Sequence, residues 1–532
     1  MQLSRSKQGL MVFMAAFFLM SFNIWGPSIY ILDESKNAQC AWEMMTDGNL
    51  ITPTFNGELR TDKPPLHYYF MMISYSIFGK TALGARFFSA VWGAILMVVL
   101  FFFTTRYASI KTAWWTILVL LSSIHFILEF HLAVPDPYLI SFIGLSFMSF
   151  FHFYSTHKRT FLIPFYLFMG LGVMTKGPIA MALPGLCILL FIILKRNLTW
   201  SFIKKLNPLL GLLILSVVII PWYYMVSLKT DGEWLHSFLL DHNINRFSNQ
   251  MEGHGGIFLI TPAYFIMGFL PFAFFLPQVI KHTWQTRNND LTLFSALIVL
   301  VFVTFFSVSS TKLPNYPMPC FAFGAILFGR YFEALMTQKI KKSFSHSLYA
   351  LLGLTLLIPL VILIALPFEP LLQHLTWLPL TVITMPISVG IAIYLRRHSN
   401  PRNTLISIGG GFMLTSMLLF SIFFTAIDQH TPVSLTLNEL ISAPHVASYG
   451  SLNPAFVFNY GKIHKLTDSI ATEDFLASPG NILLTTQKHV KKNPHWTSHQ
   501  IILECKDIFD NRETVVIKSL SINKLSSNKE TH

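Results

Sequence analysis

Apolar segments long enough to cross a bilayer recur along this chain of 532 residues. A transmembrane helix needs about 20 predominantly apolar residues, and about thirteen segments meet that requirement. They lie near residues 9–30, 84–105, 112–130, 137–155, 160–174, 178–194, 206–227, 258–280, 291–308, 315–334, 346–367, 372–395 and 404–425. Only 12% of the residues are charged, against about 25% in a soluble domain. The sequence therefore predicts an all-α polytopic membrane protein.

The loops between these segments differ in charge. Clusters of Lys and Arg, such as those in 195–205 and 396–402, fall on the side of the N-terminus, which the positive-inside rule makes cytoplasmic. The net charge of +13 then reports orientation rather than affinity for nucleic acid. An odd number of spans places the C-terminus outside, together with two long loops, 31–83 and 228–257. The first apolar run lacks a small-residue cleavage site, so we expect a retained helix.

The composition changes at about residue 429, where Lys, Asn, Ser and Thr replace Phe and Leu. Short alternating runs follow at 455–460, 482–486, 500–503 and 514–517, and these are typical of β-strands. We therefore predict a membrane domain over 1–428 and a small extracytoplasmic α/β domain over 429–532.

Carboxylates gather at the outer ends of predicted spans. Asp33 and Glu34 follow the first span directly, Asp62 lies in the basic segment 60–65, and Asp136 is flanked by prolines at the start of a span. Each has an ordinary alternative: a charge after a span can be a solvated end, and Asp136 can cap its helix. Three such sites on one face favour acid–base chemistry there.

Cations gather on the same outer boundary, where the positive-inside rule does not favour them. They are Lys63, Lys176, Arg246 and Lys312. Any one of them can simply extend toward outer headgroups. Four together indicate an anionic ligand, most simply the phosphate of a lipid.

Several familiar motifs are absent from the sequence. It contains no GxxxxGK[ST] loop, no GxGxxG and no Asp-x-Asp pair, so a nucleotide donor has no evident site. The four cysteines form no CxxC motif. His242 and Asp62 could share a metal ion, but no spacing requires it. We predict neither a metal nor a cofactor.

Taken in order, the outer-face motifs resemble those of the aminoarabinose lipid A transferases, called ArnT. These motifs are Asp33-Glu34, Asp62-Lys63-Pro64-Pro65, Asp136-Pro137, Thr175-Lys176-Gly177, His242-Asn243-Ile244-Asn245-Arg246-Phe247 and Lys312-Leu313-Pro314-Asn315-Tyr316. The family belongs, with the protein O-mannosyltransferases, to the membrane-embedded C-type glycosyltransferases (GT-C). The resemblance covers essentially residues 1–330. It implies a polyprenyl-phosphate sugar as donor and an active site on the outer face.

The resemblance also implies a role for each matching residue. Asp33 would be the catalytic carboxylate that activates the acceptor, supported by Glu34, and Asp136 would orient acceptor or sugar. The donor phosphate would be held by Lys63, Arg246, Lys312, Tyr316 and Lys176, in a cavity that also contains Lys36, Asp62, His242 and Asn243. Two places depart from the family pattern: Lys36 stands where Arg is frequent, and Leu59-Arg60-Thr61 stands before the Asp62-Lys63-Pro64-Pro65 motif, where an aromatic residue is frequent.

The function predicted from the sequence is a glycosyltransferase of the bacterial inner membrane with its active site in the periplasm. It would transfer a sugar, with an aminopentose as one candidate, to lipid A or another envelope glycolipid by an inverting displacement. A protein acceptor is one alternative, and a transporter or flippase of lipid-linked sugars is another. Transporters place ionisable groups near the bilayer midplane between repeats. The carboxylates at span ends therefore favour the enzyme.

Overall fold

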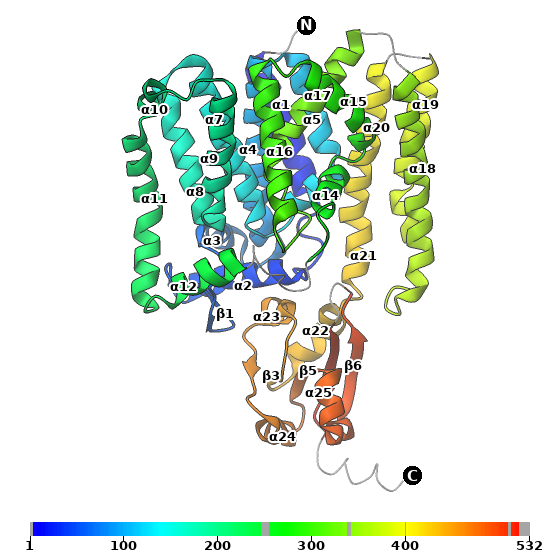
Figure 1. Ribbon diagram of the computed structural model, residues 1–532. Helices are drawn as coiled ribbons and strands as arrows, with labels where there is room; N and C mark the ends of the chain where they lie inside the picture. The colour runs from blue at the N-terminus through cyan, green and yellow to red at the C-terminus, as the bar shows by residue number, and fades with distance from the viewer. Residues whose placement is uncertain (1–3, 246–254, 338–341, 399–400, 509–511, 521–532) are drawn as a thin grey trace.

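The protein consists of a helical bundle with a small separate domain attached at one end (Figure 1). The computed structural model describes residues 4–245, 255–337, 342–398, 401–508 and 512–520. Helix α1 (Arg5–Ser21) begins at the end of the bundle opposite the small domain (Figure 1).

Every apolar segment predicted to span the membrane contains helix. The bundle helices are α1 (Arg5–Ser21), α4 (Ala82–Tyr107), α5 (Ile110–Ser122), α6 (Ile124–Phe130), α7 (Asp136–Thr156), α8 (Leu162–Lys176), α9 (Ile179–Leu194), α11 (Pro208–Lys229), α14 (Ile260–Gly268), α15 (Leu276–Gln285), α16 (Asp290–Val308), α17 (Phe321–Thr337), α18 (Lys342–Ala365), α19 (Thr384–His398), α20 (Pro401–Leu418) and α21 (Phe424–Asp428). A short helix, α10 (Trp200–Lys205), lies in a loop at the N-terminal end of the bundle.

Among the residues that the structure describes, seven helices are long and apolar enough to cross a membrane, or nine if two bent pairs each count as one span. The count of thirteen stays a prediction. One bent pair is α5–α6, whose axes differ by 74°. The bend occurs at Ser123, which ends α5 in an extended conformation and whose hydroxyl accepts the Phe126 N–H of α6. A serine that caps the next helix in this way interrupts the helical hydrogen-bond ladder.

Burial separates the central helices from the peripheral ones. The most apolar window of α7 is 78% buried inside the protein, whereas the corresponding windows of α11 and α18 are only 17% buried. A helix that is apolar all round and little buried is expected to face lipid. Helix α7, which begins with Asp136, therefore lies in the protein interior.

The two predicted outer loops contain their own helices. The first loop forms α2 (Leu32–Thr46), a hairpin of β1 (Thr54–Phe55) and β2 (Glu58–Leu59), and α3 (Leu66–Phe78), and the second forms α12 (Glu233–Leu239) and a π-helical turn, Leu240–Asn245. These elements lie at the same end of the bundle as the small domain (Figure 1). Segments far apart in the chain thus meet on one face.

The small domain contains a mixed five-stranded sheet. Its elements are α22 (Pro432–Ser442), β3 (Val446–Ser448), α23 (Pro454–Tyr460), β4 (His464–Lys465), α24 (Ser469–Ala477), β5 (Ile482–Thr486), α25 (Gln487–Lys492), β6 (Gln500–Lys506) and β7 (Glu513–Lys518). The strand order is β4-β3-β5-β7-β6. Strand β3 pairs in parallel with β4 and β5, and β7 pairs antiparallel with β5 and β6.

The strand predicted at 455–460 is wrong, because this segment is helix α23. Asn453 caps the helix by accepting the Ala455 N–H, and Pro454 occupies its first turn. Both features favour a helix start, and a short apolar run cannot by itself distinguish helix from strand. The other three predicted strands coincide with β5, β6 and β7.

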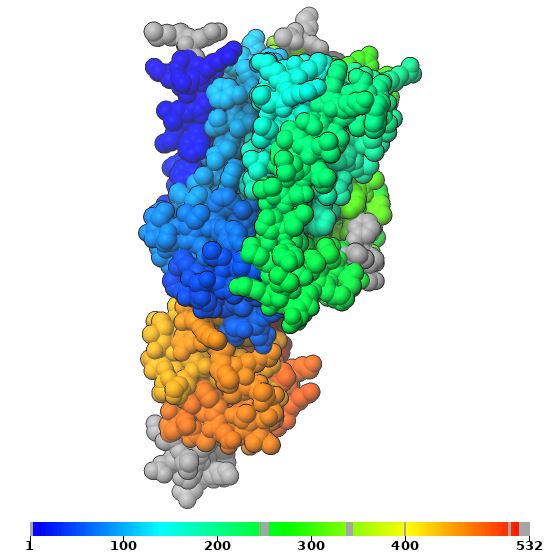
Figure 2. Space-filling model, turned by 90° about the vertical axis from the view of Figure 1, so that its left-hand side faces the viewer, coloured from blue at the N-terminus to red at the C-terminus, as the bar shows by residue number. Residues whose placement is uncertain are grey.

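The small domain docks onto the first loop. Asn56 of the hairpin exchanges two hydrogen bonds with the backbone of Ile463, at 2.8 and 3.0 Å. The Asn459 side chain donates to the carbonyl of Ile29, and Phe458 packs in a cluster that includes Ala38 of α2. Figure 2 shows the first-loop region directly above the domain. The domain therefore contacts the helix that carries Asp33.

A buried ion pair joins α2 to the bundle. Arg86 of α4 donates to both carboxylate oxygens of Glu34, at 2.7 and 2.8 Å, and to the carbonyls of Ile24, Pro27 and Ser28. Glu34 also accepts the backbone N–H of Ala133, just before α7. All five guanidinium N–H groups have partners.

We expect Arg86→Met to destabilise the protein strongly, because it leaves the Glu34 carboxylate buried without its cation. Removal of one member of a buried pair costs about 3–5 kcal/mol. Thermal unfolding in detergent measures the change. The exposed Arg106 of α4 supplies the matched control, Arg106→Met, which should leave the melting temperature nearly unchanged. An equally small effect of Arg86→Met would contradict the importance of this pair.

Candidate functional site

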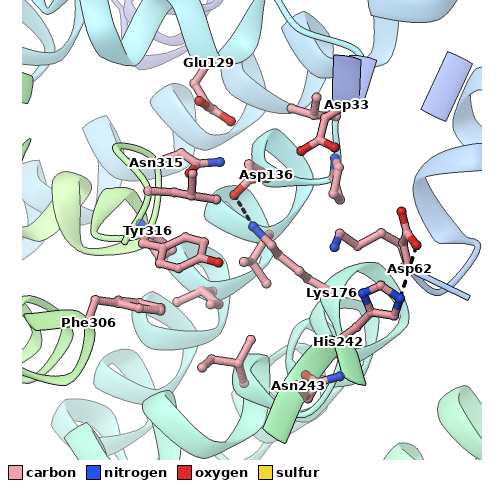
Figure 3. Close-up of a pocket in the computed structure, with 18 of the residues that line it drawn as sticks. Asp33, Asp62, Glu129, Asp136, Lys176, His242, Asn243, Phe306, Asn315 and Tyr316 are labelled. Atoms are coloured by element: carbon pink, nitrogen blue, oxygen red, sulfur yellow. Dashed lines mark hydrogen bonds and ion pairs between the residues drawn. The ribbon is translucent and has the colours of Figure 1, made fainter. Parts of the chain in front are cut away.

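A cavity of about 270 Å³ opens at the end of the bundle that carries the outer loops. Its lining comes from the first loop, from the start of α7, from α9 and α12, and from the segment before α17. Figure 3 shows its charged side chains pointing toward one another. The predicted site residues that line it are Asp33, Asp62, Lys63, Asp136, Lys176, His242, Asn243 and Tyr316.

Asp33 reaches the cavity from the first turn of α2, where the helix dipole favours a carboxylate. The Asn37 side chain donates to the Asp33 carbonyl at 2.8 Å. The amide oxygen of Asn37 accepts from Arg60 and Tyr68, and it also lies 3.2 Å from His67 Nε2. This buried network fixes the first turn of α2 against the rest of the loop.

Asp136 and Lys176 form an ion pair across the cavity wall. The Lys176 Nζ lies 2.6 Å from the Asp136 carboxylate and 5.4 Å from the centre of the Tyr316 ring. Gly177, which follows Lys176, has a φ of +93°, and a Cβ there would lie 2.6 Å from the Phe238 ring of α12. Glycine at this position therefore permits both the turn and the close approach of α12.

A further set of charged side chains, Arg60, Asp62 and His242, joins the first loop to the second. Asp62 lies 3.3 Å from Arg60 and 3.3 Å from His242 Nε2. Burial by itself would raise the pKa of Asp62, but the positive charges of Arg60 and Lys63 outweigh it and hold the pKa at about 2. Burial, reinforced by the same two cations, lowers the pKa of His67 well below its usual value. Asp62 is therefore ionised and His67 neutral at neutral pH.

Two residues that sequence reasoning missed also line the cavity. Arg60 is buried, and its Nε and Nη1 atoms have no hydrogen-bond partner in the described part of the chain. Glu129 of α6 is buried within a segment that the sequence marks only as a span. The sequence contains one feature that could have identified Glu129, namely a carboxylate inside an apolar run. Ionisable groups within membrane spans are energetically costly and are commonly functional.

Some predicted residues do not reach the cavity. Glu34 does not line the cavity, because its carboxylate binds Arg86 and the backbone N–H of Ala133. Its catalytic role stays a prediction. Lys36 and Lys312 are absent from the lining, and Lys312 Nζ donates instead to the carbonyl of Ser309. Arg246 lies outside the described residues.

The described residues contain no group of three or more His, Cys, Asp and Glu side chains that could hold a metal ion. Asp62 and His242 lie 3.3 Å apart but form no such group of three among the described residues. A pair of this kind supplies two of the four ligands that a tetrahedral site needs.

Comparisons with known proteins agree with the resemblance seen in the motifs. Residues 62–224 match the family model described as dolichyl-phosphate-mannose-protein mannosyltransferase. An undecaprenyl phosphate-alpha-4-amino-4-deoxy-L-arabinose arabinosyl transferase of Shewanella sediminis is 29% identical over 62% of this chain and 60% of its own length. The protein of the same name from Aeromonas hydrophila is 29% identical over 69% of this chain and 66% of its own. These alignments thus span slightly less than two thirds of either relative.

The fold is similar to that of a solved structure over almost its whole length. ArnT from Cupriavidus metallidurans, bound to undecaprenyl phosphate, superposes with a TM-score of 0.79 at 18% identity, covering 96% of this chain and 98% of that one. Its apo form superposes with a TM-score of 0.76. These structures confirm the predicted membrane fold with a small C-terminal domain, and the family model and the relatives confirm the predicted resemblance.

The low pKa of Asp62 predicts that its carboxylate survives acidification. A lowered pKa keeps the charged form down to a pH of about 2, whereas an ordinary aspartate, with a pKa of about 3.9, is largely protonated at about pH 3. Infrared difference spectra between wild type and Asp62→Asn at about pH 3 should lack a protonated-carboxyl band, which a short aspartate peptide shows under the same conditions. A strong band would contradict the ion pairs of Asp62.

Proposed function

We propose that this chain, an ArnT-like membrane glycosyltransferase, transfers a sugar from a polyprenyl-phosphate carrier to an envelope acceptor. The observation that supports this proposal best is the composition of the cavity, which brings Asp33 together with the cations Arg60, Lys63 and Lys176 beside an apolar wall. Polyprenyl-phosphate sugars combine an anionic group with a long apolar chain. The cavity offers a complementary surface for both parts.

The donor phosphate fits the cationic part of the cavity. Lys63, Arg60 and Lys176 line it, and the unpartnered donor atoms of the Arg60 guanidinium suit a phosphate oxygen. An apolar wall of Leu139, Ile143, Leu183, Phe302 and Phe305 continues from the charged region between α7, α9 and α16. We assign the polyprenyl chain to this wall because apolar side chains let a hydrocarbon chain pack against the protein without entering water.

The proposed reaction is a single displacement at the anomeric carbon. An acceptor oxygen forms a bond to that carbon, the bond from the carbon to the carrier phosphate breaks, and the electron pair leaves with the phosphate. Asp33 takes the proton of the acceptor as general base. The fixed cations stabilise the charge that develops on the phosphate, and Asp136, held by Lys176, orients acceptor or sugar.

The substrates of the relatives suggest finer assignments. We propose an aminopentose as the sugar, following the named relatives, and lipid A or another envelope glycolipid as the acceptor. The apolar helices and the relatives support a multi-pass protein of the bacterial inner membrane, and we place the cavity and the small domain in the periplasm. A protein acceptor and a flippase activity are separate outcomes of the experiment below.

We expect Asp33→Asn to reduce transfer at least about 100-fold, because loss of a general base typically costs that much or more. The purified protein in lipid receives polyprenyl-phosphate sugars and envelope lipids, and mass spectrometry follows carrier and acceptor. Asp47→Asn, at the exposed end of the same helix, is the matched control. Undiminished turnover by the Asp33 variant would remove Asp33 from its role. Sugar that stays on its carrier with wild type would favour a flippase.

We expect Lys63→Ala to weaken donor binding, because it removes a cation from the phosphate region of the cavity. A charged hydrogen bond contributes about 1.5–3 kcal/mol, or roughly a 10- to 100-fold change in Kd. Titration with undecaprenyl phosphate measures this change. The exposed Lys229 of α11 provides Lys229→Ala as control, and equal affinities of the two variants would contradict the phosphate assignment.

A further inference from the structure

Glu129 is a buried carboxylate in the cavity that the displacement does not use. Its side chain comes from α6 and is only 5% exposed. It lines the same cavity as Asp33 and Asp136. Asn315 hydrogen-bonds this side chain, yet Oε1 has no partner among the described residues.

A buried carboxylate oxygen without a partner is costly in a folded protein. Transfer of an ionised carboxylate out of water is compensated only by a cation or by hydrogen bonds. Lys176 acts on Glu129 as well, but its Nζ lies 2.6 Å from Asp136 and pairs with that carboxylate. The negative charges of Asp136 and Asp33 also act on Glu129. This part of the cavity therefore contains three carboxylates, Asp33, Asp136 and Glu129, beside one cation, Lys176, so negative groups are in excess.

The two parts of the cavity have opposite character. In Figure 3, Glu129 and Asn315 lie on one side of the Asp136–Lys176 pair, and His242 and Asn243 lie on the other. Asp33 is on the Glu129 side. The other side contains the segment with Arg60 and Lys63, which carries the proposed phosphate site. A ligand that fills both parts would carry an anionic group at one end and a cationic group at the other.

We propose that Glu129 binds the protonated amine of an amino sugar carried by the donor. This assignment rests on the proposed function and names the residue that recognises the amine of the proposed aminopentose. The ammonium of the sugar supplies the donor that Oε1 lacks and neutralises the excess charge beside Asp33. A neutral hydroxyl provides a hydrogen bond but no charge, so it compensates a buried carboxylate less well. Glu129 thereby selects cationic sugars, and Asn315 positions its side chain.

The test compares two donors on the same polyprenyl-phosphate carrier. One carries 4-amino-4-deoxy-arabinose, whose amine is protonated, and the other carries arabinose, which has a hydroxyl at that position. Wild type should use the amino donor with a kcat/KM roughly 10- to 100-fold higher, the range expected for a charged hydrogen bond. Glu129→Gln, which is nearly isosteric, should lose this preference, so that the ratio of kcat/KM for the amino donor to that for the arabinose donor falls toward one.

Controls separate this subsite from a structural role. Asp290→Asn removes a carboxylate that pairs with Lys195 at the start of α16 and should keep the wild-type preference for the amino donor. Glu129→Asp keeps the charge and should retain part of that preference. The comparison of the two donors with wild type requires no variant, so it remains informative if Glu129→Gln does not fold.

Three results would overturn the assignment. They are equal use of both donors by wild type, an equal loss with both donors in Glu129→Gln, and a preference of wild type for uncharged hexose donors. In each case the proposed transferase function still stands. By contrast, an absence of transfer from every polyprenyl-phosphate sugar would overturn the proposed function itself and the assignment with it.

Discussion

The structure depends on the buried pair of Glu34 and Arg86 at the boundary between the bundle and the first loop. Arg86 binds the carboxylate together with three backbone carbonyls after α1, and Glu34 reaches the backbone before α7. One pair therefore joins α1, α2, α4 and α7. Because both charges are buried, separating them inside the protein would leave an unpaired buried charge, which is strongly destabilising.

This junction determines where the reactive carboxylates lie. Asp33 precedes Glu34 on α2, and Asp136 begins α7 three residues after Ala133, so the same contacts position both toward one cavity. The small C-terminal domain adds hydrogen bonds to the hairpin residue Asn56 and, through Asn459, to Ile29 just before α2. The first loop is thus held between two bodies. Precise chemistry requires that the reacting side chains, here Asp33 and Asp136, are held rigidly in place.

Much of the architecture could be predicted from the sequence. Apolar segments mark helices because lipid requires every backbone group to be satisfied within the segment, and the ends of those segments placed Asp33, Lys63 and Asp136 on one face. The misassigned strand at 455–460 reflects a physical ambiguity, since a short apolar run fits either helix or strand. The bend at Ser123, and the bend of 107° between Ile260–Gly268 and Phe272–Gln285, were missed because hydropathy does not record the direction of a helix axis.

The sequence by itself determined the membrane class, the sidedness of the motifs and the types of residue available for chemistry, because these follow from hydropathy, charge and local order along the chain. Only the tertiary structure decided which side chains meet. Successive residues on a helix point about 100° apart, so Asp33 faces the cavity while adjacent Glu34 binds Arg86. Likewise Arg60 and Glu129 became site residues only through packing of distant segments around one cavity, which short-range pattern does not encode.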